Sequence, residues 1–303
     1  MAPNVISHLY CLARDLYDQH KDPRVEHLPL TTNWVSVLLI IAAYLAFVLH
    51  FGPKWMAKRE PFELKLVMQL YNVVQVVANS LLFVYGLYYS VLQPGYSMSC
   101  QPVDHSNTSP QMMRLIYGSY GYYLLKYLDL FDTVFIVLRK KNSQVSFLHV
   151  YHHAGMVFGV SVFMTFLAGS HCTILGVINL LVHSVMYAYY FASSLGAVKH
   201  LLWWKRHITQ LQLLQFGYLT LHFLLVIVRN PCKFPVMIAF VGFTQNIFMF
   251  SMFFDFYYKT YIRKSKPAAL TEAQFEIETD IETEIETETE TRATSAEAKA
   301  KLS

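Results

Sequence analysis

The chain has 303 residues and a formal net charge of +4, and 54% of its residues are hydrophobic and 16% aromatic. This composition excludes an ordinary small soluble domain and leaves either a soluble protein with an oversized core or a membrane protein. The apolar residues are gathered in blocks of about 20, the length that crosses a hydrocarbon layer about 30 Å thick. The sequence therefore predicts an integral membrane protein.

Seven apolar segments follow one another along the chain, and polar residues interrupt the third and the sixth. The fold class that they indicate is an all-α integral membrane protein with its membrane domain at residues 32–266, because helices satisfy their own backbone groups in lipid. We expect seven transmembrane helices, at about residues 32–51, 66–92, 115–138, 146–168, 172–194, 208–228 and 234–258.

The two ends of the chain differ from this domain. Residues 1–31 carry charges and lack the apolar core of a signal peptide, so we expect an N-terminal segment that is not cleaved. Residues 267–303 hold ten of the 20 acidic residues in a repetitive run that is poor in aromatic residues. Such a composition predicts a disordered acidic tail.

Basic residues are concentrated in the loops after the first, third and fifth segments and directly after the seventh. The positive-inside rule places these loops in the cytosol, so the N-terminal segment is predicted to be lumenal and the C-terminal tail cytosolic. The first three of these loops hold Lys54, Lys58, Arg59, Lys65, Arg139, Lys140, Lys141, Lys199, Lys205 and Arg206.

All four cysteines lie within the predicted lumenal segments or at their edges. The lumen is a compartment in which disulfides can form. Four cysteines allow three pairings, and the spacing does not choose among them. One of these segments also holds Asn107-Thr108-Ser109, a candidate glycosylation site, although Pro110 follows it. The cysteines are Cys11, Cys100, Cys172 and Cys232.

The C-terminal tail ends with Lys299-Ala300-Lys301-Leu302-Ser303. Lysines at the third and fifth positions from a cytosolic end resemble the dilysine retrieval signal of endoplasmic-reticulum membrane proteins. Lys299 and Lys301 therefore favour that membrane as the location.

Three histidines stand at the start of the fourth segment, in the sequence His149-Val150-Tyr151-His152-His153. On a helix, His149 shares one face with His152 and His153, which follow it by three and four residues. An ionisable side chain inside a membrane costs roughly 2.5–3.5 kcal/mol by insertion scales. The cluster therefore indicates a functional site.

The third segment carries Lys126, Asp129 and Thr133 at helical spacing, with Asp132 beside them. Lys126 can pair with Asp129 and so lower the cost of burying both charges. The alternative to a functional role is a structural ion pair that ties helices together.

The fifth and sixth segments carry polar stripes as well. A satisfied core histidine and hydrogen bonds between helices are the structural alternatives for such residues, but the nearby histidine cluster favours a functional role for His183. The stripes consist of Asn179, His183 and Tyr187 in the fifth segment and of Thr209, Gln212 and Gln215 in the sixth.

Most of these polar groups belong to the cytosolic half of the membrane, because His149 closely follows Arg139-Lys140-Lys141 at the end of the third segment. We expect the helices to form a barrel around a polar chamber that opens to the cytosol and has an apolar far end. An acyl-CoA suits such a tunnel. The phosphates of the acyl-CoA would bind to the basic residues, and its thioester would lie at the histidines. Its hydrocarbon tail would extend into the apolar far end.

Two chemistries compete for the histidines. In the first, His152 or a neighbour acts as a nucleophile or base on an acyl group, and His183 moves protons. In the second, the histidines bind iron, as in membrane desaturases and hydroxylases, but this chain has few intramembrane histidines for a dinuclear site. A lipid transporter is a weaker alternative. No cysteine lies on the predicted cytosolic side, so a thiolate cannot be the nucleophile there.

Four motifs resemble those of the very-long-chain fatty acid elongase (ELO/ELOVL) family, in its order and spacing and within about residues 30–265. His149–His153 resembles the histidine box of the family. Lys126–Thr133 resembles the family's KxxExxDT motif, with Asp129 in place of the glutamate. The two remaining motifs resemble Asn179–Tyr187 and Thr209–Gln215.

The resemblance implies an endoplasmic-reticulum enzyme that condenses malonyl-CoA with a long-chain acyl-CoA. The products would be CO₂, CoA and a 3-oxoacyl-CoA two carbons longer, and no metal or redox cofactor is implied. It also implies a lumenal disulfide between Cys100 and Cys232. The implied partners are the ketoreductase, dehydratase and enoyl reductase of the cycle, membrane lipid and other elongase subunits, with no nucleic acid.

The roles that we assign on this basis are hypotheses. His152 takes the acyl group, His149 and His153 orient it or move protons, and His183 assists decarboxylation and condensation. Arg139, Lys140 and Lys141 meet the CoA phosphates. The expected polar network of the chamber consists of Lys126, Asp129, Asp132, Thr133, Asn179, Tyr187, Gln212 and Gln215.

Overall fold

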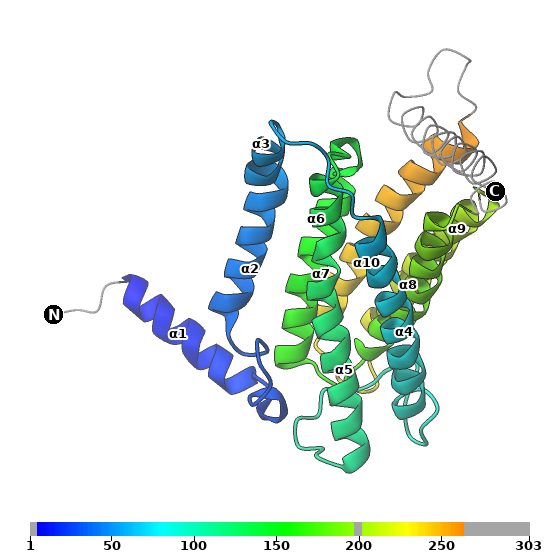
Figure 1. Cartoon of the computed structure of the whole chain (residues 1–303). Coiled ribbons are helices and arrows are strands. Elements are labelled where there is room, and N and C mark those ends of the chain that lie inside the picture. Colours follow the sequence, from blue (N-terminus) through cyan, green and yellow to red (C-terminus); the bar gives the residue numbers. More distant parts are fainter. Residues whose placement is uncertain (1–4, 197–201, 264–303) are drawn as a thin grey trace, which may run out of the picture.

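The structure, a computed structural model, describes residues 5–196 and 202–263. These residues form helices and connecting loops without any β-strand (Figure 1). The predicted acidic tail, with Lys299 and Lys301, lies outside the described residues, as does Lys199 of the predicted cytosolic loops.

Six helical segments are long and apolar enough to cross a membrane, and they coincide with six of the seven predicted spans. Two of them continue past an α-helix through a π-helical turn: α2 (Trp34–Ala46) through η2 (Phe47–Phe51) into α3 (Gly52–Met56), and α10 (Val236–Tyr257) through η5 (Tyr258–Ile262). The other four are α4 (Lys65–Tyr89), α7 (Phe147–Phe166), α8 (Thr173–Ser194) and α9 (Leu202–Val228).

The third predicted span, 115–138, is divided between α5 (Pro110–Leu128) and α6 (Leu130–Leu138). Asp129 separates them, although its φ of −59° and ψ of −20° remain in the right-handed helical region. The backbone at this residue is therefore still helical. Neither α5 nor α6 is among the six segments above, so the seventh span is not confirmed.

The long helices pack in an order that differs from their order along the chain. α7 contacts α2 and α5, α5 contacts α4, α4 contacts α8, α8 contacts α9, and α9 contacts α10 (Figure 1). The Tyr151 hydroxyl of α7 then donates to Gln245 Oε1 of α10 at 2.9 Å. Side chains on the inner faces of α7 and α8 consequently face a common interior, although these two consecutive helices are not a main packing pair.

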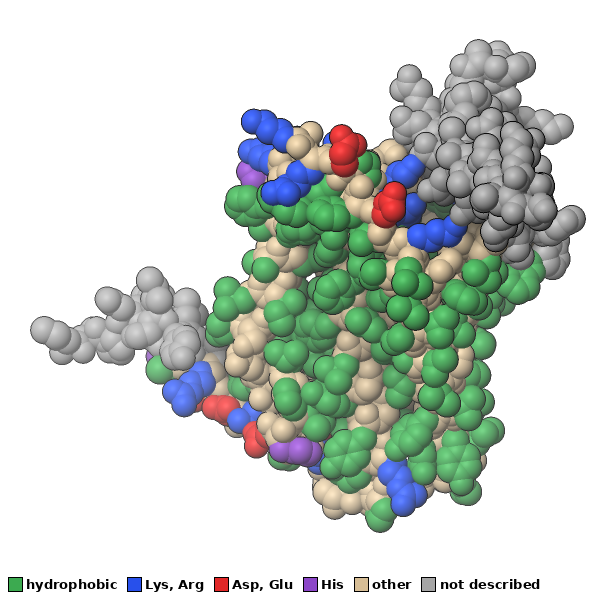
Figure 2. Space-filling view, in the orientation of Figure 1, with side chains coloured by type: hydrophobic (Ala, Val, Ile, Leu, Met, Phe, Trp, Pro, Cys, Tyr) green, Lys and Arg blue, Asp and Glu red, His purple; other side chains and the backbone are tan. Residues whose placement is uncertain are grey.

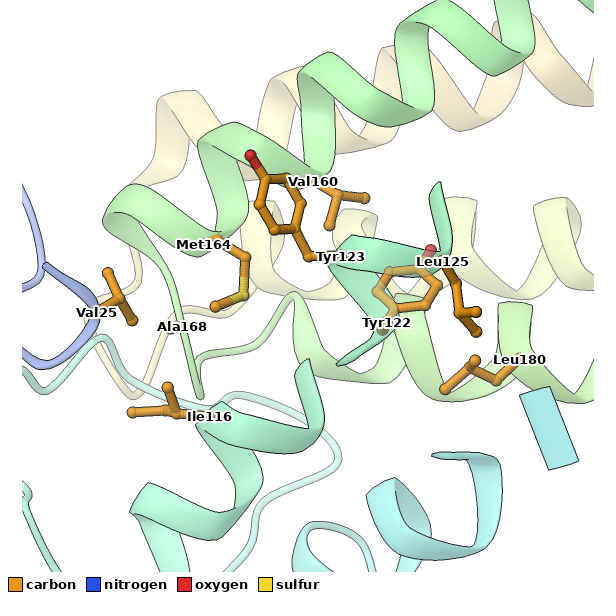
Figure 3. Close-up of a cluster of buried hydrophobic side chains, with 9 residues drawn as sticks. All are labelled: Val25, Ile116, Tyr122, Tyr123, Leu125, Val160, Met164, Ala168 and Leu180. Carbon is orange, nitrogen blue, oxygen red and sulfur yellow. The ribbon is translucent and has the colours of Figure 1, made fainter. Parts of the chain in front are cut away.

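A buried apolar cluster joins α5, α7 and α8 to the N-terminal segment, and Figure 3 shows its side chains converging. Val25 belongs to the short 3₁₀ helix η1 (Pro23–Val25) and is fully buried against this cluster. The rest of the cluster consists of Ile116, Tyr122, Tyr123, Leu125, Val160, Met164, Ala168 and Leu180.

The N-terminal segment is fastened to the bundle by a buried ion pair. Arg24 Nη2 lies 2.6 Å from Asp22 Oδ2, and their side chains are only 3% and 0% exposed. The same guanidinium donates to the main-chain oxygens of Asn107 at 2.9 Å and Ala168 at 3.0 Å. Beyond this anchor, α1 (Val5–His20) projects from the side of the bundle next to α2 (Figure 1).

The two ends of the bundle differ in chemistry. Lys and Arg side chains gather at the end that carries α3 (Figure 2), where Lys140 Nζ also donates to the Arg59 main-chain oxygen at 3.1 Å. At the opposite end of α4, a disulfide between Cys100 and Cys232 joins the α4–α5 loop to the α9–α10 loop, with 5.7 Å between the Cα atoms. This is the pair that the family resemblance implied.

Candidate active site

The three histidines of the predicted box lie in the first two turns of α7. Ser146 caps this helix, since its side-chain oxygen accepts from the His149 N–H at 3.2 Å. The ring centroids of His149 and His153 are 4.4 Å apart, and those of His152 and His153 are 5.7 Å apart. The helix therefore brings the imidazoles together as the spacing predicted.

His149 is held by a short hydrogen-bond chain across three helices. Its Nε2 lies 2.9 Å from the Thr133 hydroxyl of α6, which in turn lies 2.7 Å from the Tyr44 hydroxyl of α2. Thr133 is fully buried. A histidine tied in this way has a fixed ring orientation.

His152 and His153 have no hydrogen-bond partner among the described residues, although both make ring contacts. His153 is 8% exposed and His152 is half-buried, with its ring 6.5 Å from that of Phe253. An imidazole nitrogen that is not hydrogen-bonded within the protein keeps its lone pair for a substrate. His152 is the more accessible of the two.

A second centre forms around the carboxylate of Asp129, which is 3% exposed. Lys126 Nζ lies 2.7 Å from Asp129 Oδ2 and donates to Asn179 Oδ1 of α8 at 3.1 Å. The ammonium also lies 4.8 Å from the ring centroid of Tyr122. This buried charge pair is therefore surrounded by the polar partners that make burial tolerable.

Tyr187 of α8 connects the two carboxylates of the predicted network. Its hydroxyl lies 2.6 Å from Asp132 Oδ2 and 3.2 Å from Asp129 Oδ1. Since a hydroxyl has one proton, it donates to one carboxylate at a time. The shorter distance favours Asp132.

A polar stripe on α4 is not among the residues predicted from the sequence. Asn72, Gln75 and Asn79 are buried there, and Gln75 Nε2 donates to Asp129 Oδ1 at 2.7 Å. Asn79 Nδ2 donates to Gln75 Oε1 at 3.0 Å. The signal was present, because the three amides are spaced by three and four residues within an apolar segment.

His183 approaches the same carboxylate from α8. Its Nδ1 lies 3.7 Å from Asp129 Oδ2, which is too long for a hydrogen bond, and the ring is 6% exposed. The structure thus brings His183 to the carboxylate of Asp129 and shows no ring contact between it and the α7 histidines among the described residues.

The amides predicted on α9 are less closely connected to this centre. Gln215 is buried, and its Oε1 has no hydrogen-bond partner among the described atoms, while Gln212 Nε2 lies 3.7 Å from Met186 Sδ. At the basic end of the bundle, Arg139 Nη1 lies 3.6 Å from Met68 Sδ. Lys140 is exposed.

No group of three or more His, Cys, Asp or Glu side chains in residues 5–196 and 202–263 has an arrangement that could hold a metal ion. Of the four imidazoles, His149 is hydrogen-bonded to Thr133 of α6. The two carboxylates and Lys126 are hydrogen-bonded to Tyr and amide side chains of α4 and α8. The fold and the site together define a polytopic membrane protein with an intramembrane polar centre suited to acid–base and nucleophilic chemistry.

Comparison with known proteins identifies the family. Residues 29–269 match the ELO (GNS1/SUR4) family, and the chain belongs to it. The chain is 36% identical over 252 residues to very long chain fatty acid elongase 7 of Drosophila melanogaster, covering 83% of this chain and 76% of that protein. It is 39% identical to very long chain fatty acid elongase 7 of Rattus norvegicus, covering 82% and 89%, and 38% identical to elongase 4 of Homo sapiens, covering 82% and 78%.

Proposed function

We propose that this fatty acid elongase condenses malonyl-CoA with a long-chain acyl-CoA at the α7 histidines. The observation that supports this most directly is the hydrogen bond that ties the α7 histidine cluster, through His149, to Thr133 of α6. Thr133 lies four residues after Asp129, whose buried carboxylate has Lys126 and His183 beside it. The membrane-embedded position suits a substrate with a hydrocarbon chain, and the basic end of the bundle suits its phosphates.

The first half-reaction forms an acyl-imidazole. A ring nitrogen of His152 attacks the thioester carbonyl, the C–S bond breaks, and the proton lost from the imidazole passes to the leaving CoA thiolate. The unbonded nitrogens of His152 fit this role better than His149, whose Nε2 is engaged by Thr133.

The second half-reaction forms the new carbon–carbon bond. Malonyl-CoA loses CO₂, and the resulting carbanion attacks the acyl carbonyl while the bond to His152 breaks. One proton is taken up overall, and His183 delivers it to the imidazole, with its Nδ1 edge turned toward Asp129. The product is a 3-oxoacyl-CoA two carbons longer.

The buried network supports these two histidines. Lys126 pairs with Asp129 beside His183, and Thr133 fixes His149 next to His153. Tyr187 donates to Asp132, and Asn179 accepts from Lys126. On α9, Gln215 is buried and Gln212 approaches Met186 of α8. No metal or redox cofactor takes part in this scheme.

The finer topology belongs to the same proposal. α5 and α6 together make the seventh crossing, the N-terminus is lumenal, and the C-terminus is cytosolic in the endoplasmic-reticulum membrane. Arg139, Lys140 and Lys141 then bind CoA phosphates, and the helices enclose the acyl tunnel. Asn107 and the Cys100–Cys232 disulfide lie on the lumenal side, with Lys299 and Lys301 as the retrieval signal. The ketoreductase, dehydratase and enoyl reductase of the cycle and other elongase subunits are the expected partners.

Purified protein given labelled malonyl-CoA and a panel of acyl-CoAs tests the proposal. We expect 3-oxoacyl products, two carbons longer than the substrate, to form at the same rate with and without a metal chelator. His152→Ala and His183→Ala should each abolish product while the protein still elutes as a folded species. Normal incorporation of malonyl-CoA by either variant contradicts the assigned roles, and loss of activity in chelator favours a metal-dependent reaction.

A further inference from the structure

The amide of Gln75 fills the position against the Asp129 carboxylate that is opposite Lys126. Gln75 has no exposed surface and Asp129 has 3%, so the contact lies in a fully packed part of the bundle. Gln75 Nε2 donates to Asp129 Oδ1 at 2.7 Å, and Lys126 Nζ lies 2.7 Å from the other oxygen, Oδ2. The two donors from α4 and α5 therefore hold the carboxylate from both sides.

The orientation of the Gln75 amide is fixed by its other neighbours. Asn79 Nδ2 donates to Gln75 Oε1 at 3.0 Å, which identifies that atom as the oxygen. Gln75 Nε2 also donates to the Tyr71 hydroxyl at 2.9 Å. Since both polar ends of the amide are occupied, it cannot turn its oxygen toward Asp129 without losing these bonds.

This arrangement determines which carboxylate oxygen faces the imidazole of His183. With Oδ1 held by Gln75, Oδ2 is turned to Lys126 and to His183 Nδ1, 3.7 Å away. A carboxylate without the Gln75 contact could rotate about its terminal bond, because that torsion is broad. Gln75 thus acts on His183 through Asp129.

The lengths of the two side chains fit each other in this contact. Asp129 stands where the family motif has glutamate, so its carboxylate is one methylene closer to the α5–α6 backbone. A glutamate at this position would move the carboxylate by about the length of one carbon–carbon bond, roughly 1.5 Å, into the amide of Gln75. In a fully packed site, one extra methylene is resisted.

We infer that Gln75 is a positioning residue whose length is matched to Asp129 and that the pair sets the carboxylate against His183. The inference rests on the proposed condensation at this site. It makes a specific prediction: kcat should be retained after residue 75 is shortened by one methylene only when residue 129 is also lengthened by one methylene.

A double-mutant cycle on the full-length protein tests this prediction. The four proteins are the wild type, Gln75→Asn, Asp129→Glu and the variant with both changes, compared by kcat and by KM for acyl-CoA. Each single change should lower kcat about tenfold or more, since each disturbs a hydrogen bond to a charged group. The double variant should recover to within about threefold of the wild type, and KM should stay within about twofold in all four.

Gln69→Asn is the matched control. It makes the same change on the same helix, but Gln69 donates to the Ser194 main-chain oxygen at 3.2 Å and does not contact Asp129. This variant should keep the wild-type kcat. Should either single variant fail to fold, Gln75→Met keeps the side-chain length without the amide and should lower kcat about tenfold with KM unchanged.

The outcomes separate the inference from the proposed function. If the wild-type protein yields no 3-oxoacyl product, both the proposed condensation and the matching of Gln75 to Asp129 are overturned. An active wild type whose double variant loses as much as the two single variants combined overturns only the matching of Gln75 and Asp129. Loss of kcat in Gln69→Asn equal to that in Gln75→Asn would show a general effect of shortening α4 side chains and would overturn it as well.

Discussion

At the scale of single residues, polar neighbours explain how Lys126 and Asp129 can be buried as a pair inside a lipid-embedded bundle. Their side chains are 1% and 5% exposed, and neither relies on the other alone, because Asn179 and Tyr122 surround the ammonium and Gln75 meets the carboxylate. A buried ion pair of this kind gives little net stability, but breaking it by removing one partner is expensive.

Lys126→Met should therefore destabilise the protein strongly, by about 3–5 kcal/mol, since it leaves the Asp129 carboxylate buried without its cation. Lys126→Met combined with Asp129→Asn should recover most of that loss, because no uncompensated charge remains. Thermal unfolding of the detergent-solubilised protein measures both variants. Equal destabilisation of the single and the double variant would mean that the charge pair does not govern stability here.

Among the candidate residues, helical spacing predicted those on one helix better than those that meet across helices. The shared face of His149, His152 and His153 and the stripe with Asn179 and His183 follow from helix geometry alone. The contact of Asp129 with Gln75 depends on which helices are neighbours. The packing order of the helices, with α4 between α5 and α8, cannot be predicted from the spacing of residues along any one helix.

Six predicted spans coincide with long apolar helices because apolar length is a strong local signal, whereas the third is helical but not confirmed as a span. α5 carries Lys126 and several tyrosines on its buried face, so its composition resembles that of a polar helix even though Tyr122 and Tyr123 are buried. The N-terminal segment shows the same limit. The sequence around Asp22 and Arg24 is typical of an exposed, charged segment. In the structure the two residues form a buried ion pair that anchors the segment to the bundle.

Arg24→Met tests this anchor. The change leaves Asp22 buried without its partner and removes the donors to Asn107 and Ala168, so it should destabilise the protein by about 3–5 kcal/mol. Arg14→Met is the matched control, because Arg14 lies 3.8 Å from Asp18 on the exposed surface of α1 and should not alter the unfolding temperature. Unfolding temperatures that agree between the two variants would show that the buried pair is not an anchor.

At the scale of the whole molecule, the arrangement separates three kinds of chemistry along the bundle. Basic side chains gather at the end with α3, the imidazoles and carboxylates lie within the helices, and the disulfide closes the opposite end. The buried apolar cluster of Figure 3 fixes α5 against α7 and α8, and so fixes Asp129 relative to both sets of histidines. The site is therefore a product of the entire bundle.

The most direct test of the account is to look for the acyl group on the protein. Wild-type protein incubated with an acyl-CoA in the absence of malonyl-CoA should release a burst of about one CoA per active chain, since the first half-reaction then cannot proceed further. Mass spectrometry should find the acyl mass on His152, and the His152→Ala variant should show neither burst nor adduct. A wild type that elongates its substrate yet carries the acyl group on another residue, or on none, would contradict the account.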